Sequence, residues 1–393
     1  MSAAQWRKAM NAGAQAQAWP RQRRVAVASA APAADSRSYA TPSLPAWLQW
    51  ISQRVSARHV LVMAFVLIYP WVATPFFTFQ IGGQALVLGL IALSLTFLGG
   101  YGGMISLAQM TVAGIAGYMV AIFGTSSMPE ISLGWPWWVV VPLAIAIATV
   151  CGALIGWLSV RTEGIYTIMI TLAIGVAFHY LMQQNYSLFN GWQGFQRVLT
   201  PQVLGIDWRA PVPYYYLALF WALAGYFLVK YLVRTPFGIA LQGIRDNPRR
   251  MNALGFNVTA HRVVAYAAAG LVAAVGGVLL VWYNGLITPG SVGTSWLINI
   301  LIIAVLGGMR HPIGPFLGAI VFVLLQNFAI DVFDRERFNL VIGAMFLAIV
   351  LFSPDGLLGL WQRLRARLAA GDAQSRLSTP RPSRRFVKGG SQP

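Results

Sequence analysis

Long apolar runs separated by short polar segments dominate the chain between residues 59 and 355. Most of these runs are close to the ~20 residues that an α-helix needs to cross ~30 Å of hydrocarbon. The pattern therefore predicts an all-α integral membrane protein with about ten transmembrane helices, within a range of roughly eight to eleven. The count has a range because one run is short and because two neighbouring runs are separated only by Leu98–Gly103. The ten runs are 59–79, 82–99, 101–123, 136–159, 164–183, 213–233, 262–284, 295–309, 312–330 and 338–353.

Both ends of the chain differ in composition from this middle part. Residues 1–58 are rich in Ala, Gln, Ser, Pro and Arg and contain no long apolar run, and residues 356–393 are rich in Arg, Pro and Ser. Segments with few apolar residues and an excess of one charge cannot bury a core. We therefore expect a disordered basic tail at 1–58, a transmembrane domain at 59–355 and a second basic tail at 356–393.

The placement of the positive charges predicts an orientation in the membrane. The chain carries 28 Lys and Arg against 10 Asp and Glu, which gives a net charge of +18. If ten spans alternate from a cytoplasmic amino terminus, the cytoplasmic side holds all of these cations except Arg197, Arg209, Arg335 and Arg337. Cytoplasmic loops are typically enriched in Lys and Arg, so we expect both termini in the cytoplasm. Anionic lipid beside these loops then accounts for the charge, and no nucleic-acid partner is expected.

The residues that are missing from the apolar runs restrict the function. The chain is 57% hydrophobic and 10% charged, and no Asp or Glu lies well inside a run, since Glu163 and Asp355 stand at edges. Transporters driven by a coupling ion usually carry carboxylates within the membrane, so this class is disfavoured. There is no GxxxxGK[ST] phosphate-binding loop, so ATP hydrolysis is not expected in this chain. Any energy must enter through a partner, or the protein is a passive channel for a small neutral solute.

Candidate chemistry for an enzyme is lacking as well. Cys151 is the only cysteine, and the four histidines are scattered without a metal-binding spacing. We therefore expect no metal site and no cofactor in this chain. A membrane-embedded hydrolase or transferase would need a cluster of catalytic side chains that the sequence does not offer.

The segment between the sixth and seventh runs carries signals for a short cytoplasmic helix. Asn247 is a good N-cap, and Pro248 suits the first helical position. Gly255 suits the left-handed position just past a helix end, which predicts a helix over 248–254. A helix this short is not stable alone in water, so it must pack on something, with Met251 and Leu254 as the apolar contacts. The alternative is an amphipathic loop that rests on the membrane surface.

These loop residues resemble a known family. The run from Gly243 through Arg245, Asp246 and Asn247 to Ala253-Leu254-Gly255 is similar to the coupling loop of permease subunits of ABC importers for branched-chain amino acids, a family that includes urea and amide permeases. Further similar stretches follow in the family's order over about 82–355. They are Gly103–Gln109 with Gly114–Tyr118, Arg161–Tyr166 with Thr171–Ala173, Ala267–Gly277 and Gly314–Ala319.

The resemblance implies a multi-pass subunit of the cell (inner) membrane that works with partners. These are a second permease subunit, usually a different chain, two ATP-binding subunits and an extracytoplasmic solute-binding protein. Many members carry Glu where Pro248 stands and small residues where Arg249 and Arg250 stand, which leaves the solute open among branched-chain amino acids, amides, urea and carboxylic acids. The contact with the ATPase is expected to involve Arg245, Asp246, Asn247, Pro248, Arg249, Arg250, Met251, Leu254 and Gly255.

Small and polar residues within the apolar runs are the candidates for a translocation path. The glycine-rich 99–109 segment is expected to be a broken helix whose free backbone N–H groups receive a substrate carboxylate near Gly103, with Ser106 and Gln109 as further hydrogen-bonding groups. The alternative is that these small residues mediate close helix packing. Tyr166, Thr167 and Thr171 are expected near one face of the fifth span, where they line the path or bond to backbone carbonyls.

Overall fold

The structure is a computed structural model that describes only part of the chain. It covers residues 57–162, 164–202, 205, 207–332, 340, 343–344, 347, 351 and 356–359. The chain divides into two units, residues 1–61 and 62–393, and of the first only 57–61 are described. The expected tails, together with the tenth expected helix at 338–353, therefore lie almost wholly outside the described residues.

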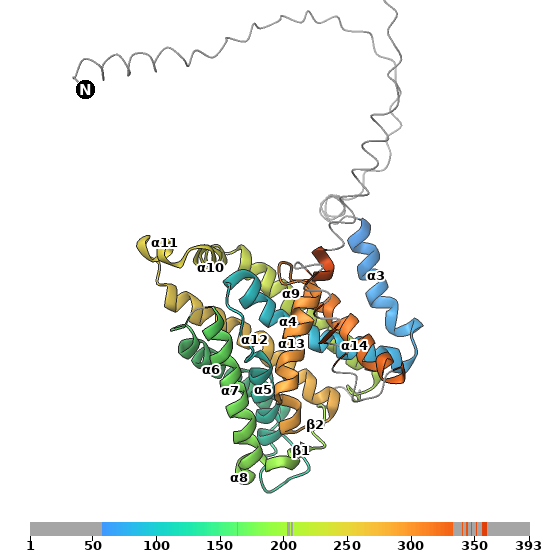
Figure 1. Ribbon diagram of the computed structural model, residues 1–393. Coiled ribbons are helices and arrows are strands. Elements are labelled where there is room, and N and C mark those ends of the chain that lie inside the picture. The colour runs from blue at the N-terminus through green and yellow to red at the C-terminus, as the bar shows by residue number, and fades with distance from the viewer. Residues whose placement is uncertain are drawn as a thin grey trace, which may run out of the picture. The chain divides into compact units, whose positions relative to one another are not determined.

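Helices form nearly all of the described chain (Figure 1). The long ones are α3 (Ala57–Val72), α4 (Gln84–Thr96), α5 (Gln109–Phe123), α6 (Trp137–Ser159), α7 (Ile165–Gln184), α9 (Pro211–Arg234), α12 (Val258–Asn284), α13 (Thr294–Gly307) and α14 (Gly314–Val332). Short elements are the π-helices η1 (Phe77–Gly83) and η2 (Phe97–Tyr101), the 3₁₀-helices η3 (Gly191–Gln193) and η4 (Pro289–Val292), and α8 (Tyr186–Phe189), α10 (Pro236–Asp246) and α11 (Pro248–Ala253).

These helices confirm the all-α membrane class. Nine of the ten expected runs coincide with a long helix of the described chain. Within the described residues, six helical segments are long and apolar enough to span a membrane, while α5 and α14 are apolar but shorter. The six segments are Phe77–Tyr101, Trp137–Ser159, Ile165–Gln184, Pro211–Arg234, Val258–Asn284 and Pro289–Gly307.

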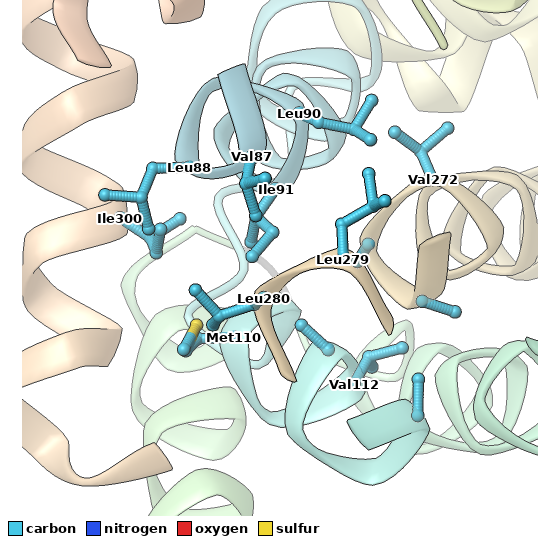
Figure 2. Packing of buried hydrophobic residues seen from close by; sticks show 14 of the residues in the cluster. Val87, Leu88, Leu90, Ile91, Met110, Val112, Val272, Leu279, Leu280 and Ile300 are labelled. Carbon is cyan, nitrogen blue, oxygen red and sulfur yellow. The ribbon is translucent and has the colours of Figure 1, made fainter. Parts of the chain in front are cut away.

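Helix α4 lies at the centre of the bundle because it has no polar face. All of its residues except Leu86 are buried, as expected for a helix that is apolar all round. Its only hydroxyls, on Ser94 and Thr96, donate back to the carbonyls of Ile91 at 2.6 Å and Ala92 at 3.0 Å. Its neighbours include α12, α13, α14 and α9. Figure 2 shows its side chains Val87, Leu88, Leu90 and Ile91 packed with Leu279 of α12, Ile300 of α13 and Met110 of α5.

Glycines bring α12 close to α6 on one side and to α5 on the other. A Cβ on Gly152 of α6 would lie 3.2 Å from the Cα of Gly270 in α12. A Cβ on Gly277 of α12 would overlap the backbone carbonyl of Ala113 in α5. Small residues commonly allow membrane helices to approach in this way. The α5–α12–α6 group therefore forms a tightly packed unit beside α4.

A two-residue ribbon closes the end of the bundle that lies opposite α10 and α11 (Figure 1). Strand β1 (Phe195–Gln196) pairs antiparallel with β2 (Leu286–Ile287), with Phe195 opposite Ile287. Phe195 is fully buried, and its ring meets that of Tyr118 edge to face. The ribbon therefore fastens the segment after α7 to the turn that follows α12.

Candidate functional site

Two capped helices, α10 and α11, form a projection between α9 and α12, where one short helix was expected. Asn247 accepts a hydrogen bond from the backbone N–H of Arg250 at 2.9 Å, and Pro248 occupies the first turn. Gly255 has φ +88°, the left-handed conformation predicted for it. The expected start of the short helix is thus confirmed, and the helix ends at Ala253, one residue earlier than expected.

Sequence reasoning missed α10, which precedes this short helix. Thr235 caps α10 by accepting from the N–H of Gly238 at 3.4 Å, and Pro236 follows it in the first turn. This Thr-Pro pair has the same capping chemistry as Asn247-Pro248, so a local signal was present. Helix α10 buries Gly238, Ala240, Leu241 and Ile244 and therefore lies against the bundle.

Helix α11 extends outward from this support. None of its six described residues is buried. Leu254, just past its end, is 65% exposed, and Asp246, Arg249 and Arg250 are exposed too. Met251 is only half-exposed, because its sulfur packs on α10, 2.9 Å from where a Cβ on Gly243 would lie. The tip therefore presents two arginines and one leucine.

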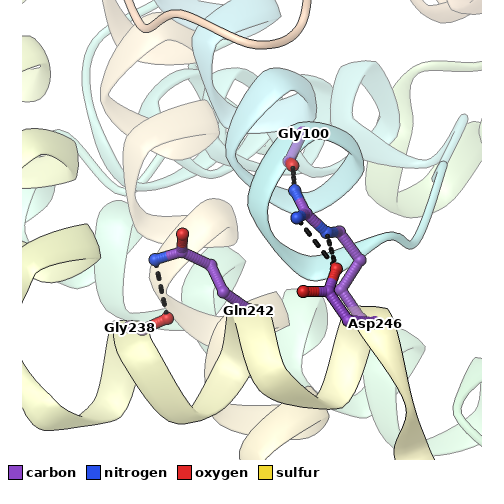
Figure 3. A network of polar contacts seen from close by, with 5 residues as sticks. Gly100, Gly238, Gln242 and Asp246 are labelled. Atoms are coloured by element: carbon purple, nitrogen blue, oxygen red, sulfur yellow. Dashed lines mark hydrogen bonds and ion pairs between the residues drawn. The ribbon is translucent and has the colours of Figure 1, made fainter. Parts of the chain in front are cut away.

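Arg245, expected in the same contact, instead reaches back to Gly100 of the bundle; Figure 3 shows this bond and the neighbouring Asp246. Its Nη1 donates to the backbone carbonyl of Gly100 at 2.6 Å. Its Nε donates to Oδ1 of Asp246 at 3.0 Å, and its Nη2 lies 2.9 Å from the same oxygen. Arg245 thus bridges the last residue of α10 and the end of η2.

The expected helix break is present between η2 and α5. Gly103 has φ +68°, and helical structure resumes only at Gln109. Ser106 within the break and Gln109 at its end are both buried. Gln109 accepts a hydrogen bond from the Ser94 hydroxyl at 3.1 Å, and the N–H of Leu107 donates to the Thr171 hydroxyl at 3.1 Å. The Ser106 hydroxyl has no hydrogen-bond partner among the described residues.

The three candidate residues of α7 do not share a face. Thr167 and Thr171 are buried, whereas Tyr166 is 66% exposed. This corrects the expectation of one common face, because neighbouring residues on a helix stand 100° apart while residues four apart are aligned. Both threonine hydroxyls donate to backbone carbonyls, Thr167 to Thr162 at 2.9 Å and Thr171 to Thr167 at 2.9 Å. The Thr171 hydroxyl also accepts the hydrogen bond from Leu107 in the break.

Two further hydroxyls near the break were missed by sequence reasoning. Tyr266 of α12 lies beside Ser106 and beside Ser159, the last residue of α6. All three side chains are buried, and their oxygens make no hydrogen bond of normal geometry within the described residues. Isolated Ser and Tyr residues in apolar helices usually mediate packing, so no local pattern marked this cluster. We call Ser106, Ser159 and Tyr266 the hydroxyl cluster.

Metal-binding chemistry is absent from the described part of the chain. No group of three or more His, Cys, Asp or Glu side chains is found there. The polar side chains described at the break are the hydroxyl of Ser106, the amide of Gln109 and the guanidinium of Arg245.

Comparison with known proteins identifies relatives. Residues 77–350 match the sequence profile of a family described as branched-chain amino acid transport system, permease component. The chain is 24% identical to the high-affinity branched-chain amino acid transport system permease protein LivM of Salmonella typhimurium, over 69% of this chain and 68% of that protein. It is 22% identical to the ribose import permease protein RbsC of Haemophilus influenzae, over 70% of this chain and 84% of that protein. No solved structure matches the chain.

Proposed function

This chain belongs to the permease family of branched-chain amino acid transport systems, and we propose that it is the transmembrane subunit of an ATP-driven importer. The solute is a branched-chain amino acid or a related small polar compound, such as an amide, urea or a carboxylic acid. The relatives include permeases named for branched-chain amino acids and for ribose, so the family alone does not select one solute.

The observation that carries the proposal is the projection formed by α10 and α11. A six-residue helix without buried residues gains little from its own hydrogen bonds, and it needs a partner surface. Leu254 offers apolar area at its end, while Arg249 and Arg250 offer positive charge. These features support docking of α11 in a groove of a separate ATPase subunit, where the leucine is buried and the arginines face acidic groups.

The proposed arrangement places the projection in the cytoplasm. Ten spans with both termini cytoplasmic put α10, α11 and the break on the ATPase side. The β1–β2 ribbon then lies on the external side, where a solute-binding protein delivers the solute. A second permease subunit, a different chain, completes the membrane part, with two ATPase subunits below.

Reconstitution tests this function directly. The tagged chain is purified in mild detergent with the subunits that accompany it, and is placed in vesicles together with the external binding protein. We expect ATPase subunits to co-purify and labelled leucine to accumulate only when ATP is supplied on the ATPase side. Flux that is unchanged without nucleotide would show a passive channel instead.

A paired substitution tests the docking surface. Leu254→Asp places a charge in the proposed contact and should strongly reduce the co-purified ATPase. Leu199→Asp is the matched control, because Leu199 is 64% exposed against 65% for Leu254 and lies in the segment at the opposite end of the bundle. The role of α11 would be contradicted if both variants lost the ATPase equally, or if neither variant lost it.

A further inference from the structure

Arg245 joins two segments that are 145 residues apart in sequence, the projection and the helix break. It stands one residue before the end of α10, and its guanidinium reaches the Gly100 carbonyl at 2.6 Å (Figure 3). Gly100 belongs to η2, which ends at Tyr101, and α5 begins only at Gln109. A cation at a helix carboxyl end satisfies such carbonyls and complements the local dipole. Arg245 thus donates to a carbonyl near the carboxyl end of η2 from outside that helix.

The stem of Arg245 makes a second contact with the break. A Cβ on Gly103 would overlap Cγ of Arg245, so the arginine stem lies directly on the Gly103 backbone. Gly103 also has the left-handed backbone conformation that favours glycine, with φ +68°. Arg245 therefore touches both ends of the segment in which η2 stops and the break begins.

The opposite side of this segment is fixed as well. A Cβ on Gly100 would overlap the backbone carbonyl of Met309, in the turn between α13 and α14. The Tyr101 hydroxyl donates to the backbone carbonyl of Arg310 at 3.3 Å. The glycines at 99–103 are thus held between Arg245 on one side and the α13–α14 turn on the other, which leaves little freedom for the segment to move independently of α10.

Asp246 holds the guanidinium in this position. Its Oδ1 lies 3.0 Å from Nε and 2.9 Å from Nη2, which leaves Nη1 directed at Gly100. A planar guanidinium can serve both partners at once with fixed geometry, whereas a lysine ammonium cannot. The side chain is therefore engaged on both of its edges within this chain.

On the basis of the proposed function, we infer that Arg245 is the positioning residue that transmits movement of the projection to the break. When the ATPase displaces α11, α10 moves with it, because Met251 packs on Gly243. Arg245 carries that displacement to Gly100 and Gly103, which lie three to six residues before Ser106 and the start of the path. Arg245 acts on the solute only through the break. It transmits movement from the projection to the break and does not itself bind the ATPase.

Arg245→Met tests this inference because it keeps the stem and removes the donors. In reconstituted vesicles we expect co-purified ATPase and the ATP hydrolysis rate to stay near those of the parent. Solute uptake per ATP hydrolysed should fall about tenfold, within the range typical of coupling between two sites. Arg245→Lys retains the charge, so its uptake per ATP hydrolysed should lie between those of the parent and of Arg245→Met. Arg161→Met is the control, because Arg161 stacks on Trp157 at 4.8 Å and should leave the ratio unchanged.

A labelling measurement separates coupling from a general loss of structure. In a Cys151→Ala background, Ile105→Cys reports the accessibility of the break to a thiol reagent. We expect ATP to change its labelling rate in the parent and not in the Arg245→Met variant, with similar melting temperatures in both.

The outcomes distinguish the two levels of the proposal. An unchanged uptake-to-ATP ratio, or ATP-dependent labelling that persists in Arg245→Met, overturns the inference. Loss of the ATPase from Arg245→Met alone also overturns it and makes Arg245 a docking residue. If the parent chain itself brings no ATPase and transports without nucleotide, the proposed function fails.

Discussion

The backbone N–H of Leu107 donates a hydrogen bond to the hydroxyl of Thr171 at 3.1 Å, across 64 residues of sequence. Both groups are buried, so this bond fastens the helix break to α7. It is the point at which two separate candidate segments of the path, 103–109 and 166–171, come together.

Thr171→Val should weaken this attachment. Valine matches threonine in shape but leaves the buried N–H of Leu107 without an acceptor, which costs about 1–3 kcal/mol of stability. We expect a lower melting temperature in detergent and altered uptake. Thr171→Ser keeps the oxygen and should preserve both properties more closely, and equal effects of the two substitutions would argue against the hydrogen bond.

Gly255→Val should damage the end of α11. At φ +88° a residue with a Cβ is strained by about 1–2 kcal/mol, and a β-branched side chain is among the least tolerated. The helix end then shifts and Leu254 is displaced, so ATP-driven uptake should fall. Gly255→Asn is the control, since asparagine tolerates left-handed conformations best among the other residues. Normal uptake by the valine variant at normal expression would refute the role of this turn.

Gly152→Val should separate α6 from α12. The first added carbon would lie 3.2 Å from the Cα of Gly270, and the γ-carbons need more room still. Overpacking of this kind typically costs about 1–3 kcal/mol, so the melting temperature should drop. Val150→Leu, on the exposed face of the same helix, should leave it unchanged. A stable Gly152→Val protein would show that the two helices adjust to one another.

Tyr266→Phe tests the hydroxyl cluster. The removed oxygen makes no hydrogen bond of normal geometry among the described residues, so stability should be unchanged or slightly higher. If the cluster serves a passing solute, uptake should fall while the melting temperature stays the same. Unaltered transport kinetics would assign the cluster to packing alone.

Local chemistry explains what was predictable from the sequence. The apolar runs predicted nine of the helices because burial in hydrocarbon requires such lengths. The start of α11 at Asn247-Pro248 and the turn at Gly255 were predictable because a cap depends only on its neighbours in the chain. The same capping chemistry at Thr235-Pro236 was overlooked, and α10 with it.

Contacts between distant segments account for what the sequence did not predict. The packing of Met251 on α10 was not predicted, because α10 itself was not foreseen. The hydrogen bond from Arg245 to Gly100 joins residues that are 145 positions apart, and no hydrophobic periodicity in the sequence indicates such a contact. The hydroxyl cluster likewise forms only when α6, α12 and the break meet, because none of its members is distinctive within its own segment.

The burial of α4 on every side limits how such a protein can change shape. In a close-packed interior, a helix that tilts alone must overlap atoms on one flank and open a void on the other. Helix α4 has neighbours all around it and so has no free flank, whereas only four residues of α7 are buried, Thr167, Thr171, Gly175 and Met182. A rearrangement of this bundle therefore requires more repacking at α4 than at a peripheral helix such as α7.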